Sequence, residues 1–410
     1  MNSTPKRSQG PGRRRVRRNA QRSALRPVRR PDQADVVTIA LLTDRVRAAA
    51  GTVIDPELRR PLSDLGMIGS VVADNHGAVK LEITLTVVGC PAAATIERDV
   101  RAAVGAVDGV TRVDVTMGVM TDAQRLALRE SLRPGATRSN PFGPGTLTRV
   151  IAVASGKGGV GKSSITVNLA AELARRGFAV GVIDADVYGF SVPALVGLAP
   201  EGVSVRPIRI DDMIVPPVAH DMKVLSIGMF VEDHDVAVAW RGPMLQRTIS
   251  QFLTDAWFGA LDFLVLDLPP GTGDVSITVG QLLPNAEIIV VTTPQPSASD
   301  VAVRAGSLAR QLNHHIIGVV ENMAERVLDD GTTMSLFGSG GGERTAAKLG
   351  TSVIATVPLS TTLRMDADAG IPVVLAHPGD PASLALGQLA DAVVRRPNRL
   401  GGLSVERSGG

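Results

Sequence analysis

Two periodicities of apolar residues divide the chain into a small and a large folded part. In the small part, apolar positions alternate with Lys80, Glu82, Thr84 and Thr86, which is typical of a half-buried strand. Helices are expected over residues 36–50 and, after Cys90-Pro91, to about residue 106, followed by a strand over 110–117. These elements predict a compact α/β domain over residues 35–120. The apolar members of the alternation are Val79, Leu81, Ile83, Leu85 and Val87.

The large part alternates continuous apolar runs with helical patterns. The runs lie near residues 150, 180, 224, 263, 288, 316 and 354, and amphipathic stretches follow most of them. Continuous apolar strands joined through helices predict a mainly parallel sheet covered on both faces. We expect this α/β domain over residues 147–396. The Pro- and Gly-rich run RPGATRSNPFGPG falls within residues 121–146, which we interpret as a linker.

Both ends of the chain differ in composition from the folded parts. Residues 1–30 hold 11 Lys and Arg and no acid, so the rest of the chain has 32 basic against 40 acidic residues. A disordered basic tail is expected over 1–34 and a disordered C-terminus over 397–410. The tail has three open interpretations: weak contact with nucleic acid or anionic lipid, no role, or a start codon assigned too early.

Composition also excludes several classes of protein. Aromatic residues are only 3% of the chain, which disfavours a stacking surface for single-stranded nucleic acid. No apolar run approaches the ~18 residues of a membrane span, and the first thirty residues lack the apolar middle of a secretory signal. The single cysteine, Cys90, excludes an intrachain disulfide and is consistent with the cytoplasm.

Residues 156–163 read GKGGVGKS and fit the phosphate-loop pattern G-x-x-x-x-G-K-[ST]. An apolar strand precedes the run and a helical pattern follows it, which is the context in which backbone N–H groups surround nucleotide phosphates. Lys162 is expected to reach the terminal phosphates and Ser163 to bind Mg²⁺. The residues predicted to bind ATP here are Gly156, Lys157, Gly158, Gly159, Val160, Gly161, Lys162, Ser163 and Ser164.

Acidic residues follow two later apolar strands. Asp184 and Asp186 end the run AVGVIDAD, and Asp267 ends LDFLVLD. Carboxylates at the ends of strands beside a phosphate loop can hold the shell of Mg²⁺ or orient the attacking water. We therefore expect Asp184 and Asp186 to be catalytic, with Asp186 and Asp267 in the metal shell. The Gly-hinged loop at 269–273 is suited to respond to the γ-phosphate.

Lys157, near the start of the loop, distinguishes this sequence from an ordinary phosphate loop. The run KGGVGKS resembles the deviant loop of partitioning-type ATPases, the family of MinD, ParA, ArsA and nitrogenase iron protein. The resemblance implies that Lys157 crosses a dimer interface to the partner's nucleotide and that the active form is a homodimer. It also implies that Asn322, after the strand near 316, binds the purine edge.

Longer motifs narrow the resemblance. The segments at 54–69 (IDPELRRPLSDLGMIG) and 89–93 (GCPAA) resemble a SufT-like domain of iron-sulfur assembly proteins. With DADVYG, WRGP, DLPPGTGD and ENM in the large part, residues 36–396 resemble the Mrp/ApbC family of iron-sulfur cluster carrier ATPases. This resemblance implies a cytoplasmic dimer that slowly hydrolyses ATP and delivers a labile cluster to apoproteins, working with assembly factors.

The chain departs from that family in its cysteines. Many members carry a Cys-x-x-Cys pair after the Glu-Asn-Met segment, but residues 324–331 read AERVLDDG. Clusters normally take four thiolates, whereas one Cys90 per chain gives a dimer two. Cys90 is the one candidate iron-sulfur ligand, and it has two interpretations. Its position at a helix start favours a reactive thiolate. A single cysteine with no partner in the sequence is also typical of a small buried apolar residue.

Two other functions stay open at this point. One is a metal-free ATP-dependent interaction factor in cluster assembly. The other is a MinD/ParA-like positioning ATPase that uses the basic tail on DNA or a membrane. The C-terminus has no basic amphipathic helix, which disfavours the membrane form.

Overall fold

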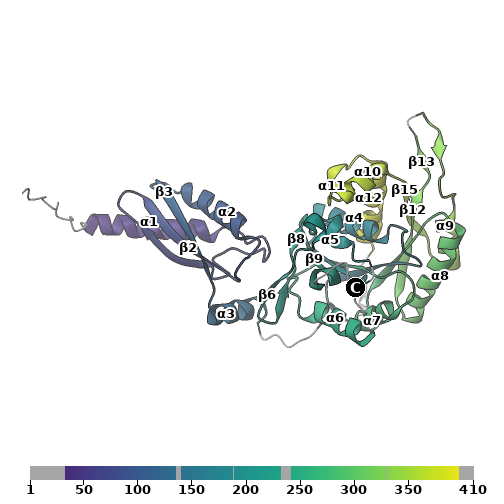
Figure 1. Cartoon of the computed structure of the whole chain (residues 1–410), viewed down its shortest axis with the longest axis horizontal. Coiled ribbons are helices and arrows are strands. Elements are labelled where there is room, and N and C mark those ends of the chain that lie inside the picture. Colours follow the sequence, from purple (N-terminus) through teal and green to yellow (C-terminus); the bar gives the residue numbers. More distant parts are fainter. Residues whose placement is uncertain (1–32, 135–139, 188, 232–241, 329, 397–410) are drawn as a thin grey trace, which may run out of the picture.

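The computed structural model describes residues 33–134, 140–187, 189–231, 242–328 and 330–396. The expected basic tail, the expected C-terminal tail, Tyr188, Asp329 and the Trp240-Arg241 half of the WRGP motif lie outside the described residues. Figure 1 shows a small α/β body and a larger one, joined on the side that carries α3 and β6.

The small body is a three-stranded sheet covered by two helices. Strand β1 runs antiparallel to the central strand β2, and β3 runs parallel to it. The predicted alternation along β2 is confirmed, since Val79, Leu81, Ile83 and Leu85 are buried. Strand β1 was not predicted. The elements are α1 (Gln33–Gly51), β1 (Ile68–Ala73), β2 (Ala78–Leu85), α2 (Ala93–Gly105) and β3 (Arg112–Val119).

The large body is built on an eight-stranded sheet in the order β15-β12-β11-β4-β10-β5-β9-β8. Seven strands are parallel and match the seven predicted apolar runs, so the predicted fold class is confirmed. Only the edge strand β8 is antiparallel. The strands are β4 (Arg149–Ser155), β5 (Val180–Asp184), β8 (Val218–Ala219), β9 (Met222–Ser226), β10 (Phe263–Asp267), β11 (Glu287–Thr292), β12 (His315–Ala324) and β15 (Val353–Pro358).

Helices cover both faces of this sheet. Right-handed crossovers place α4 and α12 on one face and α7, α8 and α9 on the other, in the arrangement that Figure 1 shows. The helices are α4 (Lys162–Arg175), α5 (Val192–Leu195), α6 (Gly242–Thr254), α7 (Asp274–Leu282), α8 (Pro296–Gln311), α9 (Gly341–Lys348), α10 (Thr361–Asp368), α11 (Val373–Ala376) and α12 (Pro381–Val394), with short 3₁₀ turns at Pro200–Gly202 and Ile227–Phe230.

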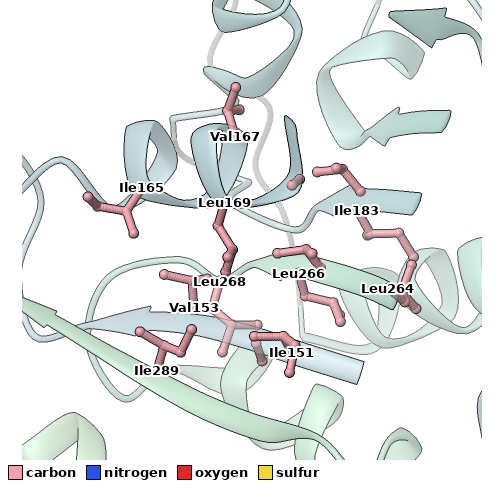
Figure 2. Packing of buried hydrophobic residues seen from close by; sticks show 14 of the residues in the cluster. Ile151, Val153, Ile165, Val167, Leu169, Ile183, Leu264, Leu266, Leu268 and Ile289 are labelled. Carbon is pink, nitrogen blue, oxygen red and sulfur yellow. The ribbon is translucent and has the colours of Figure 1, made fainter. Parts of the chain in front are cut away.

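The core of the large body lies directly beneath the predicted phosphate loop. Ile165 and Leu169 of α4 are fully buried over the strands β4 and β10, as Figure 2 shows. Each such side chain contributes about 1.5–3 kcal/mol by leaving water. Burial of the face of α4 that carries these side chains therefore fixes the start of the helix, and with it the loop, against the sheet. The strand residues labelled beside them are Ile151, Val153, Ile183, Leu264, Leu266 and Ile289.

Residues 121–146, expected as a linker, contain helix α3 (Asp122–Leu132). A capping box stabilises its start: Thr121 accepts from the N–H of Gln124, and the Gln124 side chain accepts from the N–H of Thr121. Leu128 is buried, but most residues of the helix are polar, and the segment adjoins the Pro- and Gly-rich run, which is why a linker was expected here. Arg133 then donates to the backbone carbonyls of Thr254 and Ala256, which fastens the segment to the large body.

A hairpin of the large body completes the core of the small one. Strands β6 (Ile208–Ile210) and β7 (Met213–Val215) pair antiparallel. Ile208, Ile210, Met213, Val215 and Trp257 belong to the apolar cluster of the small body, whereas Ile214 belongs to that of the large body. The ion pairs Arg59–Asp221 and Arg129–Asp212, at 2.7 and 3.1 Å, flank this junction. The two bodies thus share a continuous apolar contact. A further two-stranded hairpin, β13 (Arg326–Val327) with β14 (Thr333–Met334), extends from β12.

Candidate nucleotide site at the phosphate loop

Several positions of the loop between β4 and α4 need glycine, because the backbone there has a positive φ or lies too close to another segment for a side chain. Gly159 and Gly161 have φ of 77° and 81°, in the left-handed region. A Cβ at Gly156 would lie 2.1 Å from the backbone of Val301, and one at Gly161 would lie 2.1 Å from Nδ2 of Asn322. The loop is therefore packed against α8 and β12 from below, which leaves its other side free for a ligand.

Five side chains, from α4, from the end of β10 and from the turn after β5, meet at the start of α4. The Lys162 ammonium lies 2.7 Å from Oδ2 of Asp267 and 3.5 Å from Oδ2 of Asp186. Ser163 and Thr166 donate to the two carboxylate oxygens of Asp267, at 2.6 and 2.7 Å. The structure thus brings together the predicted Lys162, Ser163, Asp186 and Asp267. Thr166 was missed by sequence reasoning, although its place one turn after Lys162 on α4 puts it on the same helix face.

Asp184 lies one layer deeper than expected. It is fully buried and accepts hydrogen bonds from Ser226 Oγ and from the N–H groups of Asp186 and Val192. Burial, together with the charge of Asp267, raises the pKa of Asp184 well above its ordinary value. Asp186 borders the cavity described next and Asp184 does not. Asp184 thus holds the turn that carries Asp186, and its predicted catalytic role stays a prediction.

A cavity of about 450 Å³ opens over the loop. Backbone and side chains of the loop form one wall, and Asp186, Ser191 and Pro270 form the other. Pro270 belongs to the Gly-hinged loop at 269–273, and the N–H of Gly271 donates to the carbonyl of Ser155. The volume is in the size range of small-ligand sites. Lys157, Lys162 and the backbone of the loop line the cavity, and such a lining suits a chain of phosphates.

Lys157 also borders the cavity. Its ammonium donates to Oε1 of Gln295 in the same chain at 3.3 Å, and its carbonyl accepts from Ser155 Oγ. The side chain is half-buried at the edge of the cavity. This position is compatible with a contact to a second chain, and the predicted role in trans stays a prediction.

Asn322 supports the loop from β12. The side chain is 6% exposed, and its Nδ2 donates to the carbonyl of Val160 at 2.9 Å. This hydrogen bond satisfies a buried carbonyl inside the loop, so the observed contact of Asn322 is structural. Contact with a purine edge, as expected from the resemblance, stays a prediction.

The surroundings of Cys90 bear on the two interpretations given above. The thiol is 7% exposed, and burial, with the carboxyls of Glu57 and Asp55 adding to it, raises the pKa of Cys90 to about 11. Hydrogen bonds with the backbone of Ala92 and Ala93 act in the opposite direction, as expected for a helix start, but burial outweighs them. Cys90 thus lies in the apolar cluster of the small body, which favours the buried-residue interpretation, and its predicted role as a ligand stays a prediction.

The described residues show no other cluster that would replace the missing thiolate pair. None of the His, Cys, Asp and Glu side chains in these ranges form a group of three or more suited to a metal ion. The segment that follows the Glu-Asn-Met motif is the β13–β14 hairpin, in which Asp330 accepts from the N–H and Oγ1 of Thr332.

The fold and the loop define a phosphate-loop NTPase domain joined to a small α/β domain. Residues 146–394 match the family model described as NUBPL iron-transfer P-loop NTPase, and residues 43–115 match that of an iron-sulfur cluster assembly protein. The chain therefore belongs to the family of NUBPL iron-transfer P-loop NTPases, and the family resemblance seen in the motifs is confirmed.

Curated relatives match along almost the whole chain. A protein of Mycobacterium bovis named iron-sulfur cluster carrier protein is 49% identical over 373 residues, which cover 89% of this chain and 96% of the relative. One of Synechocystis with the same name is 38% identical, covering 86% and 97%. Among solved structures, a nucleotide-binding protein of Archaeoglobus fulgidus in complex with ADP is 35% identical, covers 54% of this chain and 86% of its own, and has a TM-score of 0.47.

Across the described residues, no helix combines the length and apolar character that crossing a bilayer requires.

Proposed function

We propose that this protein is an ATPase, working slowly as a homodimer in the cytoplasm, that carries iron-sulfur clusters to apoproteins. The observation that carries the ATPase half is the meeting of Lys162, Ser163, Asp186 and Asp267 beneath one cavity. The carrier half is supported by relatives of that name, which match 86–89% of the chain at 38–49% identity.

The proposed chemistry divides between the loop and the acidic residues. N–H groups of the loop and the start of α4 hold the phosphates, and Lys162 stabilises charge that develops on the terminal phosphate. Lys162 is 6% exposed, so this charge acts in a site from which water is largely excluded. Asp186 orients the attacking water from the opposite wall of the cavity, held by the turn that Asp184 fixes.

The donor set fits Mg²⁺. Ser163 Oγ and the carboxylate of Asp267 are 2.6 Å apart, and the carboxylates of Asp186 and Asp267 both lie within 3.5 Å of the Lys162 ammonium, so hydroxyl and carboxylate oxygens gather at the loop. These three residues would hold the ion directly or through its water shell. When bound, Mg²⁺ supplies charge neutralisation between the phosphates.

The cluster is cargo, and this chain offers it few ligands. Cys90 is the only cysteine, is buried, and has a thiol pKa raised to about 11. Because four thiolates are the usual set, the missing ligands would come from the client protein or a small thiol. The burial of Cys90 also favours a second function, an ATP-driven interaction factor in cluster assembly that holds no metal.

Iron and sulfide assays separate the two functions. Protein purified without oxygen, with and without reconstitution, is assayed per dimer beside Cys90→Ser. The carrier function predicts labile, sub-stoichiometric iron in the parent. If Cys90→Ser retains iron, the ligands of the cluster come from a client protein or a small thiol alone. If Cys90→Ser loses iron, Cys90 is a ligand. Absence of iron in both proteins after reconstitution would reject the carrier in favour of the interaction factor.

A further inference from the structure

A second cavity, of about 570 Å³, lies between the two bodies. The small body contributes Leu58, Arg59 and Arg60, and the large body contributes Lys223 and the segment at 257–261. Val180, at the start of β5, also lines it, whereas the phosphate loop follows the opposite, carboxyl end of β4. This junction cavity is therefore separate from the nucleotide site, and an inference drawn from it is independent of the proposed function.

Lys223 is the most unusual side chain of the junction cavity. It is 7% exposed, yet among the described residues its ammonium has no carboxylate at ion-pair distance and no hydrogen-bond acceptor. Its observed contact is with the ring of Trp257, whose centroid lies 3.7 Å from Nζ. The side chain of Lys223 is buried while its ammonium borders the cavity, so a ligand in the cavity can supply the counter-charge that the aromatic face does not.

The other charges of the cavity do not supply that counter-charge. Arg59 pairs with Asp221 at 2.7 Å, and Arg60 lies 3.9 Å from Asp64. Three cations and one carboxylate, Asp221, line the junction cavity, and Asp64 pairs with Arg60 from outside the lining, so Lys223 is the cation of this set without a carboxylate partner. Burial and the charge of Arg59 lower the pKa of Lys223 to about 7, while Asp55 acts weakly in the opposite direction.

The backbone holds Arg59 in a costly conformation. Its φ of 54° is in the left-handed region that L-residues rarely adopt, whereas Asp221, with φ of 62°, lies in the two-residue turn between β8 and β9, where a positive φ is ordinary. The N–H of Arg59 donates to the carbonyl of Asp55 at 2.8 Å, which fixes the turn. Such strained positions cluster at ligand sites, where a fixed side-chain direction matters more than local stability.

We propose that the junction cavity binds a small dianion with a flat apolar part. The anionic group pairs with Lys223 and Arg59, which supplies the counter-charge that Lys223 lacks. The apolar part lies on Phe178 and Leu261, which are half-buried in the cavity wall. A volume of 570 Å³ is in the range of sites for small organic ligands. Phosphate monoesters and dicarboxylates share this chemistry, and because the ligand contacts both bodies, binding would hold them together.

Calorimetry with two model dianions tests the proposal. The full chain, with saturating ADP and Mg²⁺ to occupy the phosphate loop, is titrated with 1-naphthyl phosphate, with naphthalene-1,4-dicarboxylate and with neutral 1-naphthol. We expect binding of at least one dianion and at least tenfold weaker binding of naphthol. The tighter dianion distinguishes phosphate from carboxylate chemistry.

Variants assign the binding to the cavity. Lys223→Gln and Arg59→Gln should each weaken binding of the dianion about tenfold or more, because each removes a charge-assisted hydrogen bond. Lys223→Arg should retain binding, and Lys80→Gln, at an exposed lysine of β2, should match the parent. Arg59 is half exposed, so its variant reports on the site even if Lys223→Gln folds poorly. No dianion binding by the parent, or binding unchanged in both glutamine variants, would overturn the proposal.

Discussion

The ammonium of Lys162 lies 2.7 Å from a carboxylate oxygen of Asp267, which itself accepts hydrogen bonds from Ser163 and Thr166. Strands β4 and β10 are parallel neighbours, with Asp267 beside Val153, so the end of β10 delivers the carboxylate to the start of α4. The carboxylate of Asp267 thus contacts three side chains of α4, those of Lys162, Ser163 and Thr166.

Replacing Lys162 with Ala should reduce the rate of ATP hydrolysis by about 10²-fold or more, because a charge on the transferred phosphate is lost. Steady-state phosphate release measures the rate, and circular dichroism checks that the variant folds. Lys348→Ala is the matched control, because Lys348 is an exposed helical lysine paired only with Asp300. A Lys162→Ala protein as active as the parent would exclude the phosphate loop from the chemistry.

Lys157 should act on the nucleotide of the partner chain. Lys157→Ala chains and Lys162→Ala chains, each inactive alone, should regain up to about a quarter of the parent activity when mixed, since a mixed dimer contains one site with both lysines intact. Phosphate release is followed against mixing ratio. If no ratio restores activity, Lys157 works within its own chain, beside Gln295.

Asn322→Ala should weaken ADP binding by about five- to a hundredfold, because it leaves the buried carbonyl of Val160 without its donor at a cost of about 1–3 kcal/mol. Calorimetry with ADP and Mg²⁺ measures the affinity. Asn140→Ala removes a comparable bond to the carbonyl of Leu282, away from the loop, and should leave the affinity unchanged. Equal loss in both variants would mean that Asn322 acts only through global stability.

Glu57 should make the stability of the small body depend on pH. Burial, with Asp55 adding to it, raises the pKa of Glu57 from 4.5 to about 7. Between these values the folded state binds more protons than the unfolded state, so this group's contribution to stability falls as pH rises. The free energy of unfolding of Glu57→Gln should equal that of the parent near pH 4.5 and exceed it by on the order of 1 kcal/mol at pH 8.

Thermal unfolding of the two proteins between pH 4.5 and 8 gives this comparison. Glu97→Gln, at an exposed glutamate of α2 paired with Arg101, controls for loss of a carboxylate. A gap between Glu57→Gln and the parent that is constant across this range would show that Glu57 titrates normally.

The parallel sheet could be predicted because continuous apolar runs mark strands buried on both faces, and each predicted run became a strand. Lys162, Ser163 and Asp267 could be predicted because a phosphate loop and a strand end leave local motifs. Thr166 carries no motif of its own, and only the register of β10 against β4 reveals its acceptor.

The junction and the state of Cys90 could not be predicted, because both depend on contacts between distant segments. Helix α3 is mostly polar, and burial of Leu128 and the hydrogen bonds from Arg133 to Thr254 and Ala256 hold it against the large body. For Cys90, the helix start seen in the sequence has the expected effect on the thiol, but burial and the carboxyl of Glu57 outweigh it. Sequence alone does not rank a local effect against a tertiary one.

Transfer of a cluster under control of ATP tests the central claim most directly. The parent and Lys162→Ala are reconstituted with iron and sulfide without oxygen, and transfer to an apo-ferredoxin is followed by its visible absorbance, with and without ATP and Mg²⁺. The account predicts transfer from both proteins, with a rate that responds to ATP in the parent and not in Lys162→Ala. Failure of the parent to transfer, or an equal response to ATP in both proteins, would contradict it.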